Sequence, residues 1–334
     1  MGQEKKATGK QSWGNRLWAR TGFGDKTIWD WLQLLIVPLV LGVIGFYFTT
    51  SQEYAHQQEL EARRAKAERA LEEERLQNAI LQTYLAGMRE LLLDKNLRAS
   101  EEGSDIRAVA RAQTRSTMGQ LSPEGKGIAI QFLYEASLID KENPVVSLSA
   151  VRLRGADLSD VELQDANLSG TYLNDADLSG TSLNDTNLIG AHLSSANLSW
   201  ATLSSAEVSG AYLIGANLSN AHLSNANLRG THLMEANLSD AILRDAHMGD
   251  GVELNDANLS NADLVGANLS GAYLIDTNLS GAYLFDTNLK DTNLSGANLS
   301  GANLSGATGV TEEQLEEQAK LLEGATMPDG SIHH

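Results

Sequence analysis

Between residues 146 and 308 the chain repeats a leucine-centred pattern every five residues, and this period constrains the fold more than any other feature. The last regular stretch, residues 295–307, reads SGANLSGANLSGA. Five steps of about 100° leave each leucine roughly 140° from the one before, so a helix would scatter the set around its surface. In a straight strand an odd period sends successive leucines to opposite faces. The pattern therefore predicts a chain that turns a corner once per repeat.

The register of the repeat also predicts which residues face inward. It runs from Leu148 to Met248 as 21 repeats and from Leu254 to Leu304 as 11 more. A small residue, usually Ala or Thr, stands two positions before each centre. Positions two apart in an extended segment point the same way, so the small residue and the leucine should both be buried. The other positions are rich in Ser, Gly, Asn and Asp, which suit exposed corners.

A second rhythm predicts the number of sides. The residue just before the leucine alternates in type with a ten-residue period, and a twenty-residue coil with four sides stacks like residues on like, whereas a fifteen-residue coil does not. One outer column is then Tyr172, His192, Tyr212 and His232, and a second is Asp177, Asn197, Asn217 and Asn237. We take the first column as a candidate interaction column, because a stiff rod with flat faces can present such a ladder of side chains to a partner.

Repeats of the form A-(D/N)-L-x-x, such as ADLSG and ANLSG, resemble those of pentapeptide-repeat proteins. The resemblance covers residues 146–308. It implies a mainly β solenoid, a right-handed four-sided β-helix, here of about eight coils. No single repeat buries its own leucine, so the coils are expected to stabilise one another as neighbours.

The regular pattern is interrupted once and has to be closed at its ends. Met248 and Leu254 are six residues apart around the sequence GDG, which predicts a one-residue bulge at a corner. Residues 309–334 are predicted to be a C-terminal cap helix and tail, because exposed strand edges invite aggregation. Thr311 and Gln314 fit a capping box, an apolar face is expected from Leu315, Leu321 and Leu322, and Gly324 is expected to end the helix.

The N-terminal part predicts a membrane anchor. Residues 1–27 form a basic tail, and 28–48 are predicted to be a single transmembrane helix because 31–48 contain no charged residue. A cleaved signal peptide and a buried helix containing Pro38 are the alternatives. The first Lys or Arg after the span is Arg63, so the N-terminus is expected in the cytoplasm and the repeats outside it, as in a bacterial single-pass membrane protein.

Two helical segments are predicted between the anchor and the repeats. Residues 49–98 form a long helix or stalk, in which Leu71, Asn78, Leu85 and Leu92 interleave with Leu81 and Met88 at a spacing typical of a short coiled coil. Packing of its later half against its own domain is the alternative. Residues 99–145 form a helical cap and linker, with one helix over 105–121 and a second that begins at Ser122 and ends near Ile139. A homodimer is expected through the stalk or the C-terminal helix.

The residues that carry chemistry are sparse. The chain has no cysteine, which excludes disulfides and thiolate chemistry. His192 and His232 share a face but stand two coils, about 9.6 Å, apart, which is too far for one metal ion. His222 and His232 are half a coil apart, on opposite faces, and His247 is isolated beside the predicted bulge. We predict no enzyme, no catalytic residue, no cofactor and no metal.

Two functions fit this composition. We predict a non-enzymatic, membrane-anchored scaffold that binds an unidentified protein partner and not nucleic acid. The alternative follows from the resemblance: some pentapeptide-repeat proteins are acidic rods that mimic DNA and bind type II topoisomerases. Residues 146–308 hold 18 acidic and five basic residues, a net charge of −13. A duplex of equal length, about 38 Å, carries roughly 22 phosphate charges.

Overall fold

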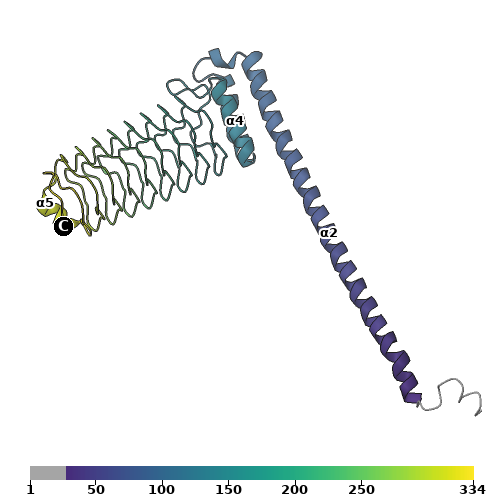
Figure 1. Ribbon diagram of the computed structural model, residues 1–334. Coiled ribbons are helices and arrows are strands. Elements are labelled where there is room, and N and C mark those ends of the chain that lie inside the picture. Colours follow the sequence, from purple (N-terminus) through teal and green to yellow (C-terminus); the bar gives the residue numbers. More distant parts are fainter. Residues whose placement is uncertain (1–27) are drawn as a thin grey trace, which may run out of the picture. The chain divides into compact units, whose positions relative to one another are not determined.

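The computed structural model describes residues 28–334, so the predicted basic tail over 1–27 lies outside the described residues (Figure 1). The chain divides into two compact units, Met1–Glu73 and Glu74–His334. The helices, in chain order, are α2 (Ile28–Leu93), the short 3-10 helix η1 (Leu97–Ala99), α3 (Asp105–Met118), α4 (Pro123–Glu135) and α5 (Glu312–Gln318). Between α4 and α5 the chain forms the repeat coils.

The predicted anchor and stalk form one continuous helix, α2, which ends at Leu93. Its N-terminal part is long and apolar enough to cross a membrane. The apolar side chains of that part are exposed in the structure: Leu35 is 68% exposed and Phe46 72%. Pro38 lies inside the helix without ending it. Length and composition therefore agree with the predicted span.

The C-terminal end of α2, within the second unit, packs on its own domain. Leu81, Tyr84 and Met88 are buried, and the Tyr84 hydroxyl lies 2.9 Å from the Thr114 hydroxyl of α3. Two of the residues proposed for a coiled-coil seam, Leu81 and Met88, are thus used inside the chain. The structure favours the alternative of intramolecular packing for this half of the helix.

Helices α3 and α4 begin with serine caps. The Ser104 side chain accepts a hydrogen bond from the Arg107 amide, and the Ser122 side chain accepts one from the Gly125 amide, with Pro123 in the first turn of α4. Both helices are shorter than predicted: α3 ends at Met118 rather than at 121, and α4 ends at Glu135 rather than near Ile139. The chain leaves α4 at Ala136 and Ser137 because Ser137 has a positive φ of 51°.

Helix α4 covers the first coils of the repeat. The Asp157 amide donates to the Pro123 carbonyl at 3.0 Å, and Asp140 forms an antiparallel bridge with Ala166. Gly127 lies so close to the coil that a Cβ there would come 2.0 Å from the Asp157 carbonyl oxygen. A glycine is therefore required at this contact.

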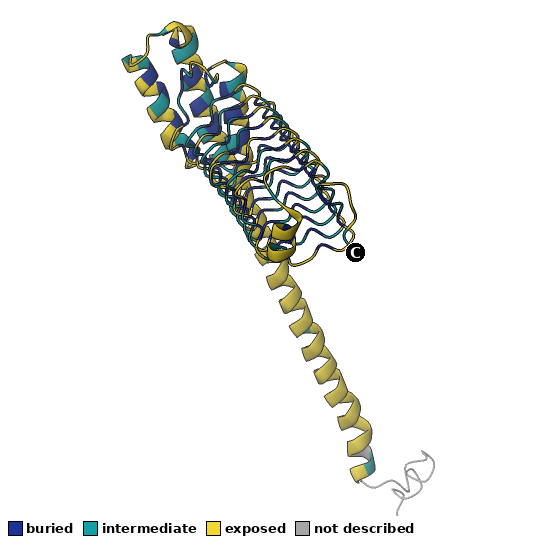
Figure 2. Cartoon of the chain, turned by 90° about the vertical axis from the view of Figure 1, so that its left-hand side faces the viewer, coloured by how far each residue is buried: buried dark blue, intermediate teal, exposed yellow. Residues whose placement is uncertain are grey.

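The repeats stack as eight coils of four sides each. Residues twenty apart form parallel bridges, as in Tyr172 with His192 and Asp177 with Asn197, and each side contributes a single bridge rather than a continuous strand. The leucines and small residues are buried, as predicted, and fill the interior (Figure 2). Threonine replaces alanine without leaving a polar group unpaired: the Thr181 hydroxyl, for example, donates to the Leu158 carbonyl of the preceding coil at 2.6 Å.

The backbone conformation at the corners explains why Gly, Asp and Asn recur in the repeat. The second residue after each leucine has a positive φ at nearly every corner, as in Asp175 (58°) and Gly210 (63°). Glycine adopts this conformation freely, and Asn and Asp tolerate it better than other residues do. The recurrent Gly, Asp and Asn at this position are therefore a requirement of the turn.

The predicted one-residue bulge is present at the GDG sequence. Bridges that cross it join residues 21 apart, beginning with His232 and Glu253, and the spacing returns to 20 from Glu253 to Tyr273. Gly251, with φ of 86°, occupies the additional position. Leu254 and Val252 remain buried, so the insertion does not disturb the core.

The C-terminal end differs from its prediction. The capping box of Thr311 and Gln314 is present, but α5 ends at Gln318, so Gly324 does not end it. Leu321 instead bridges Asn298 and is 47% exposed, while Leu322 is buried as the centre of another repeat. The coil continues to Thr326, which bridges Asn303, and α5 replaces only one side of it. The prediction was wrong because the repeat resumes after an insertion that hides its register.

Candidate functional site

Four columns of outward side chains run along the coils, each built from the residue before the inward leucine. Parallel bridges join the residues of one column on successive coils, so the backbone sets the order of side chains along each column. We call the side that contains Tyr172 the tyrosine–histidine face and the side that contains Asn197 the asparagine face. Each face comprises the outward residues immediately before and after its inward leucines.

The four predicted residues of the tyrosine–histidine face lie in one stack. Ring centroids are 4.6 Å apart between Tyr172 and His192, 4.9 Å between His192 and Tyr212, and 4.8 Å between Tyr212 and His232. The planes are within 28° of parallel. Stacked rings contribute about 0.5–1.5 kcal/mol per pair beyond their buried area. Their faces are thus used within the stack, and Tyr172 and Tyr212 remain partly exposed.

Two charged residues extend this column, and the sequence analysis did not include them. Arg152 bridges Tyr172 on the first coil, and Glu253 bridges His232 on the sixth. His232 Nδ1 lies 2.8 Å from Glu253 Oε2. Glu253 was missed because it stands 21 residues from His232, just past the bulge. The signal that could have identified Glu253 is its place immediately before Leu254, the same place that His232 has before its own leucine.

Apolar side chains distinguish the tyrosine–histidine face from the asparagine face, which has none at its outward positions. Of its outward positions over eight coils, only Arg152, Arg154 and Glu253 are charged. The repeats as a whole have a net charge of −13. The aromatic and aliphatic residues on this face are Tyr172, Tyr212, Ile214, Met234, Tyr273 and Ile275. This face therefore offers a partner more apolar surface than the asparagine face does.

The asparagine face, in contrast, satisfies its own hydrogen bonds. Each amide donates to the residue twenty or 21 positions earlier, from Asn197 Nδ2 to Asp177 Oδ1 at 3.0 Å through to Asn298 Nδ2 and Asn278 Oδ1 at 3.3 Å. The same amide oxygens accept the backbone amide two residues later, as in Ser219 to Asn217 at 3.2 Å. The second predicted column thus forms a continuous ladder in which each amide both donates to and accepts from its neighbours.

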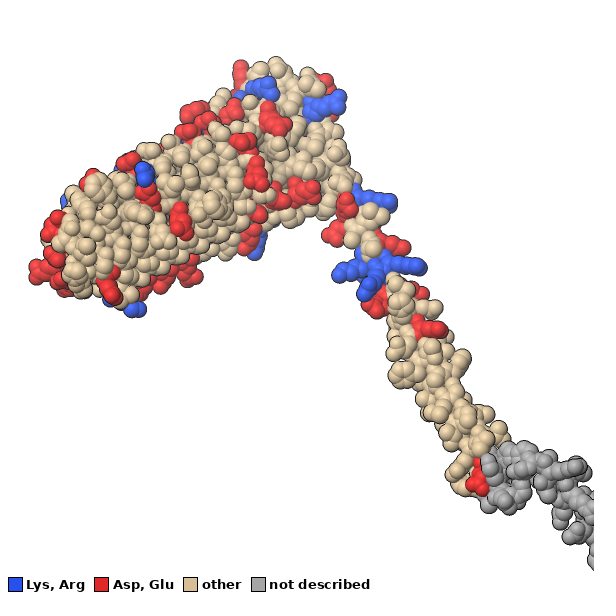
Figure 3. Space-filling view, viewed as in Figure 1, with Lys and Arg blue, Asp and Glu red and all other residues tan. Residues whose placement is uncertain are grey.

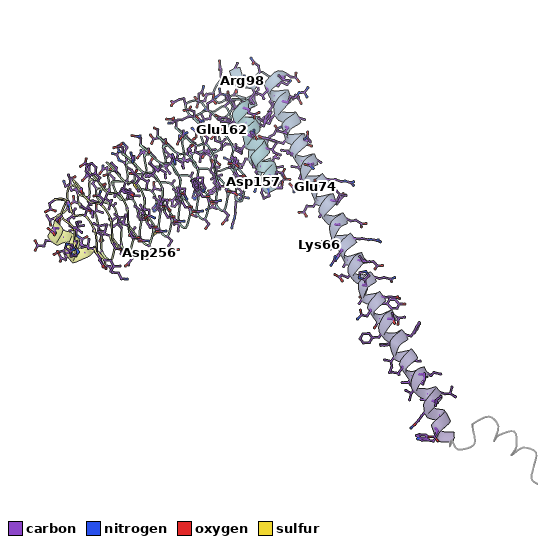
Figure 4. All side chains as sticks on the ribbon, viewed as in Figure 1. Lys66, Glu74, Arg98, Asp157, Glu162 and Asp256 are labelled. Atoms are coloured by element: carbon purple, nitrogen blue, oxygen red, sulfur yellow. The ribbon has the colours of Figure 1, made fainter. Side chains whose placement is uncertain are left out.

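Acidic residues lie mainly at the corners and not in one band. One edge carries Glu235, Asp256 and Asp276 on three successive coils. Arg154, Arg229 and Arg244 neutralise acids on neighbouring coils, pairing with Asp175, Asp250 and Asp263. Figure 3 shows the acidic side chains scattered over the visible side of the repeats. Figure 4 places Asp157 beside α4 and Asp256 several coils further along.

Within residues 28–334 no three His, Asp or Glu side chains are placed to hold a metal ion. A hollow of about 670 Å³ lies where α5 replaces one side of the coil, between Asp291, Asn293 and Glu317. Burial lowers the pKa of Lys126, and burial together with Glu162, Asp165 and Asp140 raises the pKa of Tyr134. Both groups belong to the contact between α4 and the first coils.

Stacked parallel bridges with one inward leucine per side define a β-solenoid. A family model described as pentapeptide repeats matches this region in eight copies, over residues 147–185, 171–210, 181–220, 211–250, 253–291 and 277–308. The chain belongs to the pentapeptide-repeat family, which implies a right-handed solenoid. The gap in the match between 250 and 253 coincides with the bulge.

Solved structures similar to this chain are also pentapeptide-repeat proteins. HetL of the cyanobacterium Nostoc sp. strain PCC 7120, involved in heterocyst differentiation regulation, is 32% identical over 61% of this chain and 98% of its own, with a TM-score of 0.34. QnrB1, a plasmid-mediated fluoroquinolone resistance protein, is 20% identical over 55% and 88%, with a TM-score of 0.35. Rfr23 of the cyanobacterium Cyanothece 51142 is 41% identical over 29% and 58%, with a TM-score of 0.15. A comparison with curated protein sequences gave no match.

Proposed function

We propose that this protein is a non-enzymatic, membrane-anchored scaffold that binds a partner protein through its tyrosine–histidine face. The observation that carries the proposal is the contrast between two faces of the same rod. The amides of the asparagine face are hydrogen-bonded to one another, whereas the tyrosine–histidine face presents Tyr172, His192 and Tyr212 without a side-chain hydrogen bond in the described part of the chain. Unpaired polar groups beside apolar side chains are typical of a contact surface.

The membrane anchor rests on α2. Its apolar part is exposed, and burial of that surface in a bilayer supplies the environment that such side chains require. We propose that the N-terminus lies in the cytoplasm and the repeats on the other side, as the first Lys or Arg after the span, Arg63, indicates.

Two experiments test the proposal. In a bacterium, a reporter active only outside the cytoplasm is fused after His334; activity is expected, and activity of a cytoplasmic reporter in its place would contradict the orientation. A photoreactive residue is then placed at Tyr212 or, as the matched control on the same coil, at Asn217. Crosslinked products are expected from position 212 and not from 217. Equal capture at both positions would remove the assignment of the face.

The second candidate is an acidic rod that mimics DNA and binds a type II topoisomerase. The net charge of −13 over the repeats favours it. The run of three acids along one edge, with three arginines paired to acids elsewhere, gives a weaker pattern than the continuous phosphates of a duplex. A cytoplasmic location of the repeats, followed by inhibition of DNA binding to a purified topoisomerase by the full chain, would favour this candidate over the scaffold.

A further inference from the structure

Over its first six coils, the column of the tyrosine–histidine face is complementary to its own reverse, and Tyr273 and Asn293 continue the column beyond them. Six successive coils present Arg152, Tyr172, His192, Tyr212, His232 and Glu253, joined by parallel bridges. Read backwards, the column presents an acid, then alternating histidines and tyrosines, then a base. A second copy of the column in the opposite direction would therefore place Arg152 against Glu253 and every tyrosine against a histidine.

The groups in this column have free bonding capacity. Arg152 is exposed and forms no ion pair among the residues that the structure describes. The hydroxyls of Tyr172 and Tyr212 donate to no neighbour in residues 28–334. His232 uses Nδ1 for Glu253, which leaves Nε2 available. A tyrosine hydroxyl that meets an imidazole nitrogen satisfies both groups.

The spacing of the column restricts what can match it. Neighbouring coils of a solenoid are about 4.8 Å apart, whereas a helix advances about 5.4 Å per turn and same-face residues of a strand are about 6.7 Å apart. Over the five steps from Arg152 to Glu253 a helix loses about 3 Å of register and a strand about 9 Å. A second copy of this chain has the same spacing and keeps its register throughout.

We propose that two copies associate through the tyrosine–histidine face in antiparallel orientation. The twofold axis lies between the levels of His192 and Tyr212, so each copy contributes the same residues to the contact. The contacts pair Arg152 with Glu253, Tyr172 with His232, and His192 with Tyr212 of the other copy. This inference rests on the proposed function, because it names the partner of the same face.

Charge selects the antiparallel arrangement. In a parallel pair Arg152 would face Arg152 and Glu253 would face Glu253, and like charges opposite one another are unfavourable. The acids that give the repeats their negative charge lie mostly at corners and on other faces, while this face carries two bases and one acid. Because one face of a narrow rod is a small contact, the association is expected to be weak in solution and favoured by tethering in a membrane.

The test uses the full chain in membranes and the fact that it contains no cysteine. Copies with Arg152→Cys and differently tagged copies with Glu253→Cys are expressed together and treated with a short thiol crosslinker. The antiparallel contact brings residue 152 of one copy to residue 253 of the other, whereas like residues are about 24 Å apart. Mixed crosslinks are expected to exceed like-residue crosslinks about tenfold or more. Asp157→Cys with Asn258→Cys, on the asparagine face of the same coils, is the matched control.

A charge exchange checks the pair directly. Arg152→Glu alone and Glu253→Arg alone are each expected to reduce dimer formation about tenfold, since both oppose the contact, and copies of the two variants mixed together are expected to recover it. Recovery would not occur if either substitution merely damaged the fold. Arg244→Glu, on another face, is expected to leave dimer formation unchanged.

The outcomes separate this inference from the proposed function. Predominant like-residue crosslinks, equal crosslinking of the control pair, or no mixed crosslink would overturn the antiparallel dimer. If the mixed crosslink is absent while a photoreactive residue at Tyr212 captures a different protein, the inference fails and the scaffold function stands. If position 212 captures nothing, both fail.

Discussion

His232 Nδ1 lies 2.8 Å from Glu253 Oε2, although an additional residue separates the two coils from which these side chains come. The additional residue of the GDG sequence is therefore accommodated entirely at the corner. The column of outward residues continues across it, and Glu253 occupies the position that a regular repeat would give it. This relationship leads to the first prediction.

Deletion of Gly251 should be tolerated. The deletion leaves MGDVEL, in which Met248 and Leu254 have the regular five-residue spacing and Asp250 already has the positive φ of 54° that a corner needs. We expect a melting temperature within about 4 °C of the original protein, corresponding to a change of less than about 1 kcal/mol. Thermal unfolding followed by circular dichroism measures it.

Deletion of Gly230 is the control for this experiment. Gly230 belongs to a regular repeat, so its loss shifts every later leucine by one position relative to the coils before it. We expect a large drop in melting temperature or no folded protein. Equal stability of the two deletions would show that the register is not what holds the coils together.

Gly127→Ala should weaken the contact between α4 and the first coil. The new Cβ would come 2.0 Å from the Asp157 carbonyl oxygen, so the helix must move away, at a cost of about 1–3 kcal/mol. Hydrogen exchange at the Asp157 amide, which donates to the Pro123 carbonyl, should become faster. Gly119→Ala is the matched control, because the space beside that glycine is open to about van der Waals distance.

Asn237→Asp should destabilise the asparagine ladder. Asn237 Nδ2 donates to Asn217 Oδ1 at 3.2 Å, and a carboxylate has no hydrogen to donate, so two oxygens would face each other. We expect a loss of about 1–2 kcal/mol in the free energy of unfolding. Asp177→Asn is the comparison: Asp177 begins the ladder and only accepts hydrogen bonds, from Asn197 and from the amide and hydroxyl of Ser179. An asparagine oxygen can accept the same bonds, so the replacement should change stability by less than about 0.5 kcal/mol. Similar losses for both variants would contradict the direction assigned to the ladder.

Tyr84 should make the helical part of the second unit sensitive to alkaline pH. Burial raises the pKa of its phenol above the ordinary value of about 10. Because the folded pKa is the higher one, this contribution to stability is complete below about pH 10 and declines as the pH rises further. Tyr84→Phe removes that decline and loses the hydrogen bond to Thr114, which contributes about 1 kcal/mol at neutral pH.

The measurement for Tyr84 is the difference in unfolding free energy between the original protein and the Phe variant, as a function of pH. The difference should be largest near pH 8 and shrink above about pH 10. Tyr283→Phe, at a side chain that is 54% exposed, supplies the control. A pH-independent difference for Tyr84→Phe would mean that the phenol does not titrate with unfolding.

Much of the repeat region was predictable from the residues alone. The five-residue period placed Leu173 and Leu193 inside, and the ten-residue rhythm placed Tyr172 over His192, because stacking of identical coils converts a sequence interval directly into a neighbour in space. The bulge after Met248 was predictable for the same reason. Within residues 146–308 local spacing carries the information, since each coil contacts mainly the next one.

Where the chain leaves that period, only the tertiary structure decided the outcome. The sequence predicted Leu321 and Leu322 as part of a helix. In the structure Leu321 bridges Asn298, and both leucines belong to a coil. The position of Tyr84 depended on α3, because its hydroxyl lies 2.9 Å from the Thr114 hydroxyl, and no repeat pattern relates these two residues. Contacts between elements without a shared period depend on the packing of distant side chains, and intervals along the sequence do not contain that information.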